Sequence, residues 1–245
     1  MEKMKLNRNE TKRLQGIAIL FMLGLHLFNR SDIADFYDVN LYLGGVPLLT
    51  HISYIFDACV PIYLFCSGYG LYRSEESGSS MKKRVQRILK LLIRFWIIMI
   101  LTCCVGYALG MKERFPGSLL NFILNVCLIK NSYVGAFWFV QTYTILALLS
   151  GGIFKWIRKY SYWIILPISF VLYISAFGME YLVLGRIDME VLGLLLNALM
   201  LFLRSQFSFV VGMILAKEDI LEHCKFLSIN EQILKFAQNY PTSFK

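Results

Sequence analysis

The sequence has few charged side chains. Aspartate, glutamate, lysine and arginine together make up 17% of its 245 residues, whereas 57% of the residues are hydrophobic. An average soluble domain carries about 25% charged residues. This balance excludes an ordinary soluble domain and indicates an integral membrane protein.

The chain also lacks the strict apolar-polar alternation that is typical of a transmembrane barrel. It has instead several apolar runs that approach or exceed the roughly 20 residues needed for a helical crossing. No signal-peptide cleavage site precedes the first run, so we expect this run to be retained as a crossing. The predicted fold class is all-α: a polytopic transmembrane helical bundle with about six crossings and one short re-entrant or interfacial helix.

The six cysteines lack the spacing of a metal site. No pair of them has metal-ligand spacing together with a nearby histidine. Most of them lie inside apolar runs, where a thiol behaves as a small hydrophobic side chain. We therefore expect neither a bound metal nor a resident cofactor.

The apolar runs give the expected positions of the crossings. A run of only twelve residues, 118–129, favours a re-entrant or interfacial helix. Polar residues at 204–206 interrupt the last run, so we expect a single crossing there, with its first part tilted or lying at the outer surface. The crossings are expected at residues 14–29, 51–72, 91–109, 136–154, 162–178 and within 189–216.

The positive charge has a membrane explanation. A net charge of +9 could indicate nucleic-acid binding, but the basic residues gather beside the ends of the apolar runs. The positive-inside rule explains this clustering better. It predicts a cytoplasmic N-terminus in a multi-pass protein of the cytoplasmic (inner) membrane, with the lipid bilayer and not nucleic acid as partner. The residues that set this orientation at the N-terminus are Lys3, Lys5, Arg8, Lys12 and Arg13.

One histidine lies close to the outer end of the first crossing. His26 and Gln15 are eleven residues apart, about three helical turns, so they share a face and lie roughly 16 Å apart. An ionisable side chain at membrane depth is usually kept for function. His26 is therefore a candidate catalytic residue, although a histidine that only bonds a neighbouring helix would fit the same pattern.

Asp57 is placed at a similar depth in the second crossing. A carboxylate beside His26 would fix one imidazole tautomer and stabilise the protonated ring, as a general base requires. We therefore name His26 and Asp57 as a catalytic pair. The alternative is that Asp57 caps a kink near Pro61 or faces water outside the membrane.

A basic run opens the third crossing. Arg84, Arg87, Lys90 and Arg94 recur at helical spacing, so several cations share a face at the cytoplasmic mouth. Arginine binds phosphate oxygens bidentately, which suits a phosphorylated ligand. The alternative is an ordinary positive-inside loop attracted to anionic headgroups.

Three motifs resemble the acyltransferase type 3 family of membrane proteins. LQGIAILFMLGLH is similar to the family's first helix, VPIYLFCSGYGLYRS to its second helix with the pair Ser67 and Gly68, and KRVQRILK to its Arg-x-x-Arg pattern at Arg84 and Arg87. Their order, spacing and expected sidedness agree. By this resemblance, residues 1–216 form the N-terminal part of the family's transmembrane domain. The apolar residues spaced among charges in residues 217–245 predict an amphipathic cytoplasmic tail.

The resemblance implies an O-acyltransferase that modifies cell-surface polysaccharides. An acyl group, most often acetyl, would pass from acyl-CoA on the cytoplasmic side to a hydroxyl of an extracytoplasmic carbohydrate or similar acceptor. Acyl-CoA is then a donor substrate and no further cofactor is expected. His26 would be the general base, whereas the donor would be bound by Arg84, Arg87, Arg94 and Gln15.

The chain departs from the family pattern in two ways. Gln15 stands where the family usually has a basic residue, and the chain is shorter than is common in the family, so we expect a truncated family member. Two alternatives therefore stay open: a non-catalytic or degenerate membrane protein of the same family, and a small-molecule transporter with His26 and Asp57 as a proton relay.

Overall fold

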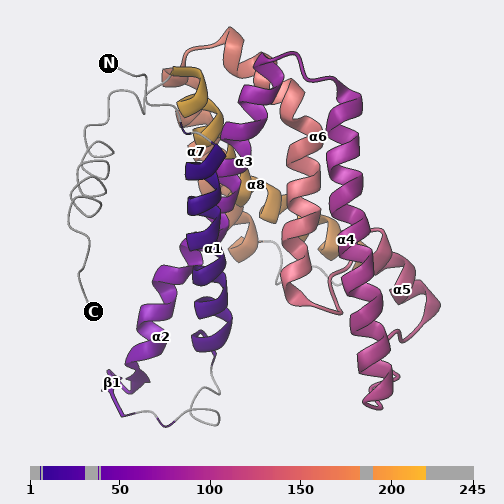
Figure 1. The fold of residues 1–245 in the computed structure, drawn as a ribbon. Helices are drawn as coiled ribbons and strands as arrows, with labels where there is room; N and C mark the ends of the chain where they lie inside the picture. Colours follow the sequence, from indigo (N-terminus) through magenta and orange to yellow (C-terminus); the bar gives the residue numbers. More distant parts are fainter. Residues whose placement is uncertain (1–5, 7, 31–37, 39, 183–189, 219–245) are drawn as a thin grey trace, which may run out of the picture.

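The computed structural model describes residues 6, 8–30, 38, 40–182 and 190–218 of the chain. Apart from one two-stranded hairpin, its regular elements are helices, so the all-α membrane bundle is confirmed (Figure 1). The tail and most of the acidic loop after the first helix lie outside the described residues. The elements are α1 (Arg8–Phe28), β1 (Tyr42–Leu43), β2 (Val46–Pro47), α2 (Leu48–Ser53), η2 (Tyr54–Ala58), α3 (Cys59–Glu76), α4 (Met81–Ala108), α5 (Leu119–Val126), η3 (Gly135–Phe137), α6 (Trp138–Lys159), α7 (Tyr162–Leu182) and α8 (Glu190–Glu218).

Five helical segments of the described chain are long and apolar enough to cross a membrane. The first helix, α1, is not one of them, because it opens with a polar turn and its apolar part begins only at Leu14. The expected count of six crossings is therefore not confirmed. The five segments are Leu48–Glu76, Met81–Ala108, Gly135–Lys159, Tyr162–Leu182 and Leu192–Glu218.

The short helix expected within 118–129 is α5, which has eight residues. The Ser118 side chain accepts a hydrogen bond from the backbone N–H of Asn121 and so caps its N-terminus. The Trp96 indole of α4 donates a hydrogen bond of 3.1 Å to the carbonyl of Val126. This bond, together with apolar contacts around Phe95 and Phe115, fixes α5 against α4.

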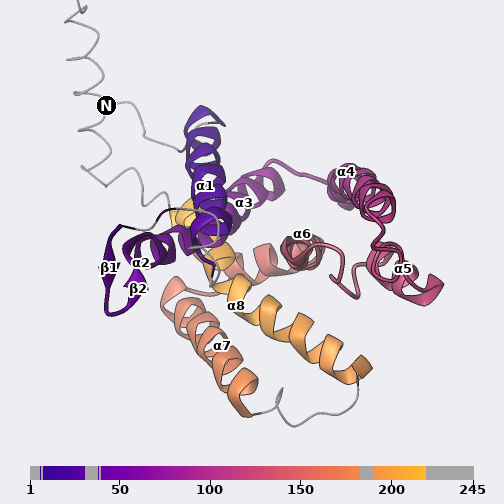
Figure 2. The ribbon, with the colours of Figure 1, turned by 90° about the horizontal axis from the view of Figure 1, so that it is seen from below.

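Helix α8 is the central element of the bundle. It contacts α3, α6 and α7, and 44% of its apolar window is buried, compared with 17–28% for the other four segments (Figure 2). The outward faces of the other helices are apolar and exposed, as a lipid-facing surface requires. The polar residues at 204–206 do not break the helix.

Polar side chains inside α8 have partners on α7. The buried Gln206 amide donates a hydrogen bond of 2.7 Å to the Ser169 carbonyl, and the Ser169 hydroxyl donates one of 2.6 Å to the Gln206 side-chain oxygen. A buried polar group that is satisfied in this way does not force the chain out of the bundle. The reciprocal bonds explain why one continuous helix of 29 residues passes through a polar interruption.

Glycines set the closest helix crossing, between α3 and α8. A Cβ at Gly68 would overlap the backbone carbonyl of Phe209, and a Cβ at Gly212 would overlap the backbone carbonyl of Phe65. Each helix thus supplies one glycine against the backbone of the other, which is the close approach that small residues permit in lipid. Gly68 of the Ser-Gly pair therefore has a packing role, whereas the Ser67 hydroxyl bonds back to the carbonyl of Tyr63 at 2.8 Å.

We expect Gly68→Ala to lower the free energy of unfolding by about 2 kcal/mol, because the added methyl group overpacks this crossing. Gly70→Ala is the matched control on the same helix, since no atom lies within 4 Å of its added Cβ. Alanine there should be neutral or slightly stabilising. Thermal unfolding of the purified protein in detergent, followed by circular dichroism, measures both. Equal melting temperatures for the two variants would contradict the role of Gly68.

Candidate functional site

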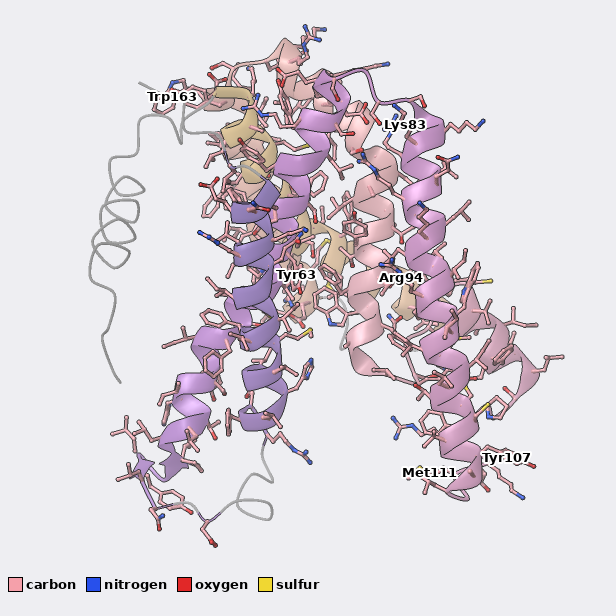
Figure 3. All side chains as sticks on the ribbon, viewed as in Figure 1. Tyr63, Lys83, Arg94, Tyr107, Met111 and Trp163 are labelled. Atoms are coloured by element: carbon pink, nitrogen blue, oxygen red, sulfur yellow. The ribbon has the colours of Figure 1, made fainter. Side chains whose placement is uncertain are left out.

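The connections sort the helix ends into two groups. The C-terminal ends of α3 and α6 lie with the N-terminal ends of α4 and α7, and we call this end of the bundle the basic end (Figure 1). Figure 3 shows Lys83 at this end and Tyr107 and Met111 at the opposite end. Polar cavities lie at both ends of the bundle.

The cavity at the basic end has a volume of about 680 Å³. Cations line it from two helices: Arg84 at the start of α4, and three residues in the last turns of α6. Positive side chains near a helix C-terminus also interact favourably with its dipole. The arrangement suits an anionic ligand. The cavity-lining residues are Glu75, Met81, Arg84, Leu148, Gly151, Gly152, Phe154, Lys155, Arg158 and Lys159.

Arg84 is held inside this cavity by Glu75. The Arg84 Nε and the Glu75 Oε1 are 3.2 Å apart, and the two side chains are only 12% and 9% exposed. The pair lacks hydrogen-bond geometry, since neither of these two atoms has a hydrogen-bond partner. A Cβ at Gly151 would overlap the guanidinium, so this glycine makes the room in which Arg84 lies against α6.

Arg87 and Arg94 lie on the same flank of α4 but not at the same depth. Both are exposed, and both lie about 100° around the helix from its buried residues Ile88 and Phe95. Arg94 is about 15 Å further along the axis than Arg84. Figure 3 places Arg94 between α4 and α6, far from the basic end. Of these three arginines, Arg84 lines the basic cavity.

His26 lies in the last turn of α1, at the end of the bundle opposite the basic cavity. The side of α1 that packs on η2 carries Gly24, where a Cβ would meet the Phe56 ring. His26 is about 200° around the helix from Gly24 and is exposed. Gln15 shares the face of His26, as expected, and is half-buried.

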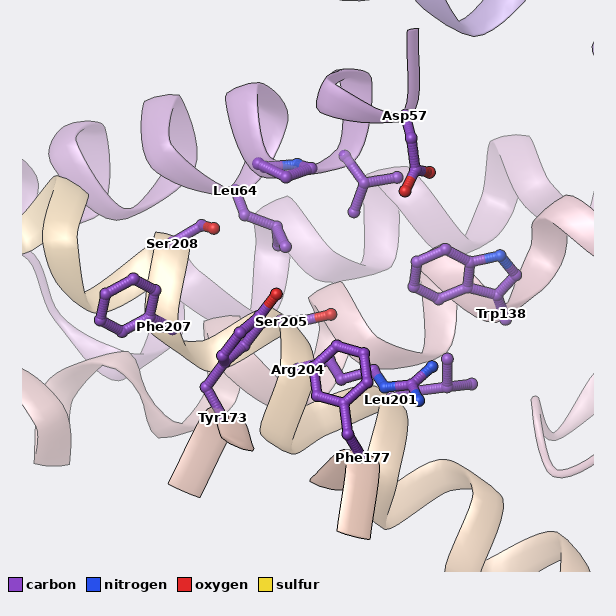
Figure 4. A pocket seen from close by; sticks show the side chains of 12 residues that line it. Asp57, Leu64, Trp138, Tyr173, Phe177, Leu201, Arg204, Ser205, Phe207 and Ser208 are labelled. Carbon is purple, nitrogen blue, oxygen red and sulfur yellow. The ribbon is translucent and has the colours of Figure 1, made fainter. Parts of the chain in front are cut away.

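The structure does not bring His26 and Asp57 together. No hydrogen bond or ion pair joins the two side chains, both of which belong to the described part of the chain. Similar depth on two helices does not fix the direction of either side chain, and Asp57 points into a cavity that α8 also lines (Figure 4). The proton relay that a transporter would need from this pair therefore has no direct link.

Asp57 lines a second cavity, of about 480 Å³, at the end opposite the basic one. It lies between η2 and α3 on one side and α6, α7 and α8 on the other, and Figure 4 shows its side chains. Aromatic rings form much of its wall, and an aspartate, an arginine and two serines supply polar groups. The lining residues are Asp57, Val60, Pro61, Leu64, Trp138, Tyr173, Phe177, Leu201, Arg204, Ser205, Phe207 and Ser208.

Arg204 is the residue of this cavity that sequence reasoning missed. Its Nη2 donates a hydrogen bond to the Glu180 carboxylate, and its guanidinium carbon lies 4.2 Å from the centre of the Phe177 ring. Its Nε is buried and has no hydrogen-bond partner. A charge inside an apolar run was the available signal, although in the sequence Arg204 stands out mainly as part of the polar interruption at residues 204–206.

The described residues contain no group of three or more histidine, cysteine, aspartate or glutamate side chains that could hold a metal ion. The expected absence of a metal stays a prediction.

Comparison with known protein families gives one result that covers this whole arrangement. A family model of an acyltransferase domain, the acyltransferase type 3 model, matches residues 12–220, from α1 to just beyond α8. No curated protein and no solved structure matches the chain. The matched range includes His26, both cavities and the α3–α8 crossing.

We expect Glu75→Gln to lower the free energy of unfolding by about 3 kcal/mol, because it leaves the buried Arg84 charge without its counter-ion. Glu76→Gln is the matched control: Glu76 is 53% exposed, pairs with Arg73 at 3.0 Å, and should matter by less than about 1 kcal/mol. Thermal unfolding in detergent compares the two. If the Glu75 variant is no less stable than the Glu76 variant, the pair is not a buried anchor.

Proposed function

The chain belongs to the acyltransferase type 3 family, and from this premise we propose that it moves an acyl group, most simply acetyl, from acyl-CoA at the basic end to a hydroxyl at the opposite end. As a family member it is a membrane acyltransferase. The proposed acceptor is an extracytoplasmic carbohydrate or a similar molecule of the cell envelope. The protein would lie in the cytoplasmic (inner) membrane with its basic end in the cytoplasm.

One observation carries the proposal: polar cavities of opposite character lie at the two ends of one apolar bundle. The basic cavity offers cations for the phosphates of coenzyme A, which are found in the cytoplasm. The second cavity has an aromatic and hydroxyl-lined wall at the end where an outer acceptor would arrive. A catalyst that joins substrates from two compartments needs this separation.

The donor would be held first by its charge. Arg84, Lys155 and Arg158 line the basic cavity, and charge-assisted bonds from such groups to phosphate are stronger than neutral ones. The Glu75–Arg84 ion pair lacks hydrogen-bond geometry, so a phosphate oxygen with better geometry competes with the carboxylate. Arg87 and Arg94 continue the cationic flank of α4 towards the opposite end, along which the thioester arm would extend. Gln15, on the His26 face of α1, would add a hydrogen bond to the donor.

His26 would act as the general base. Its ring nitrogen takes the proton of the acceptor hydroxyl while the oxygen attacks the thioester carbonyl, and the carbon–sulfur bond breaks to release the coenzyme A thiolate. The protonated imidazole then gives up this proton, which neutralises the thiolate and restores the neutral base. The position of His26 in the last turn of α1, at the end of the helix opposite the basic end, supports this role.

His26→Ala should abolish acetyl transfer while leaving membrane insertion intact, because it removes the base and not a packing contact. His51→Ala is the control, since His51 lies at the same end and contacts the Leu43 carbonyl at 3.1 Å in the hairpin region. Transfer of labelled acetyl from acetyl-CoA to cell-envelope carbohydrate is measured in membranes that contain each variant. Unchanged transfer by the His26 variant would remove this residue from the mechanism.

Arg87→Gln should raise the KM for acetyl-CoA about tenfold with little change in kcat, since a lost charge-assisted bond is worth about 1.5 kcal/mol or more. Arg87 is the better test than Arg84, because it is exposed and takes no part in the buried pair. Lys82→Gln is the control: Lys82 is an exposed cation in the first turn of α4 that lies about 140° around the helix from Arg87, away from the cationic flank. An equal rise in KM for both variants would indicate general surface charge and not a donor site.

A further inference from the structure

We propose that the cavity lined by Asp57 and Arg204 binds an uncharged sugar ring of the acceptor and rejects acidic sugars. This inference rests on the proposed function, because it identifies where the acceptor lies and what charge it carries. The cavity volume of about 480 Å³ lies in the range of small-molecule sites, which are mostly apolar with a few placed polar groups.

The aromatic wall suits one face of a sugar ring. Trp138 begins α6, whereas Tyr173 and Phe177 lie one turn apart on α7, and all three side chains line the cavity (Figure 4). The face of an aromatic ring is electronegative. The axial C–H groups of a pyranose are weakly electropositive and therefore pack on such faces. A flat or purely aliphatic ligand would leave the polar groups on the other walls of the cavity without hydrogen-bond partners.

Polar groups on the other walls match ring hydroxyls. Arg204 supplies guanidinium donors to the cavity wall, and its Nε has no hydrogen-bond partner. Asp57 supplies acceptor oxygens, and no described residue donates a hydrogen bond to its carboxylate. A hydroxyl both donates and accepts, so different hydroxyls of one ring can bond Asp57 and Arg204.

The charges of the cavity decide which sugars bind. The Arg204 guanidinium is already balanced by Glu180, with which it forms an ion pair. The Asp57 carboxylate then leaves the cavity region with a net negative charge. An anionic sugar such as a uronic acid would be repelled by this charge, whereas a neutral pyranose would not.

The test measures sugar binding without any donor. The full chain is placed in lipid nanodiscs free of sugar-based detergent, and saturation-transfer NMR compares methyl β-glucopyranoside with methyl β-glucuronoside. We expect wild-type protein to bind the glucoside at least fivefold better. Asp57→Asn should weaken glucoside binding severalfold and also shift the preference towards the glucuronoside. A general loosening of the fold would weaken the binding of both sugars and would not shift the preference in this direction.

Matched controls keep the result specific. Glu113→Gln removes a carboxylate at the same end of the bundle but outside the cavity, and it should change neither signal. Ser208→Ala gives a second cavity variant that leaves the Arg204 pair intact and should weaken glucoside binding alone. Equal binding of both sugars by wild type, or an unchanged preference in Asp57→Asn, would overturn the proposal.

The outcome is independent of catalysis. If the neutral sugar binds with the expected preference but acetyl transfer is absent, the proposed function fails and the sugar site stands. If acetyl transfer occurs but the cavity variants change neither sugar preference nor the KM for the acceptor, the acceptor binds elsewhere and the sugar site fails.

Discussion

The close crossing of α3 and α8 is the contact on which the rest of the structure depends. Gly68 and Gly212 each lie against a backbone carbonyl of the opposite helix, so the two helix axes approach more closely than larger side chains would allow. In a bilayer the lipid is as apolar as the helix surfaces, and the hydrophobic effect gives little reason for helices to associate there. Close van der Waals packing around these glycines therefore positions α8 in the centre of the bundle.

From this crossing follows the position of the cavity lined by Asp57 and Arg204. Once α8 is fixed on α3, Arg204 and Ser205 of α8 line the same cavity as Asp57 of η2, which directly precedes α3, and α7 closes another side. The reciprocal hydrogen bonds between Gln206 and Ser169 hold α7 in place. The cavity is thus built by segments that are far apart in the sequence, and each is oriented by a contact just outside the cavity.

The charged groups at the two ends of the bundle differ in how deeply they are buried. At the basic end, Arg84 and Glu75 are almost fully buried against each other, and Gly151 leaves the space for them. At the opposite end, Arg204 bonds a half-exposed Glu180 and keeps one donor unsatisfied. Both pairs leave an arginine Nε without a hydrogen-bond partner, so what separates them is depth: the pair at the basic end is much more deeply buried.

The sequence by itself determined the helices, their approximate limits, the membrane class and the family. These properties depend on local composition: apolar runs long enough to cross, basic residues at their ends, and short motifs such as the one that ends at His26. Even the short helix α5 follows from the length of its run. The crossing expected at residues 14–29 is not confirmed, because α1 opens with a polar turn and is not among the described segments that are long and apolar enough to cross a membrane.

Which side chains meet depends on how the helices pack. The sequence paired Asp57 with His26 by depth, whereas in the fold Asp57 lines a cavity together with Arg204. The sequence also grouped Arg84 with Arg94 by helical spacing, but Arg84 is buried against Glu75 and Arg94 is exposed about 15 Å further along α4. Periodicity fixes the face of a helix on which a residue lies. The neighbour that this face meets is set by how helices cross, and that depends on glycines and polar bonds contributed by distant segments of the chain.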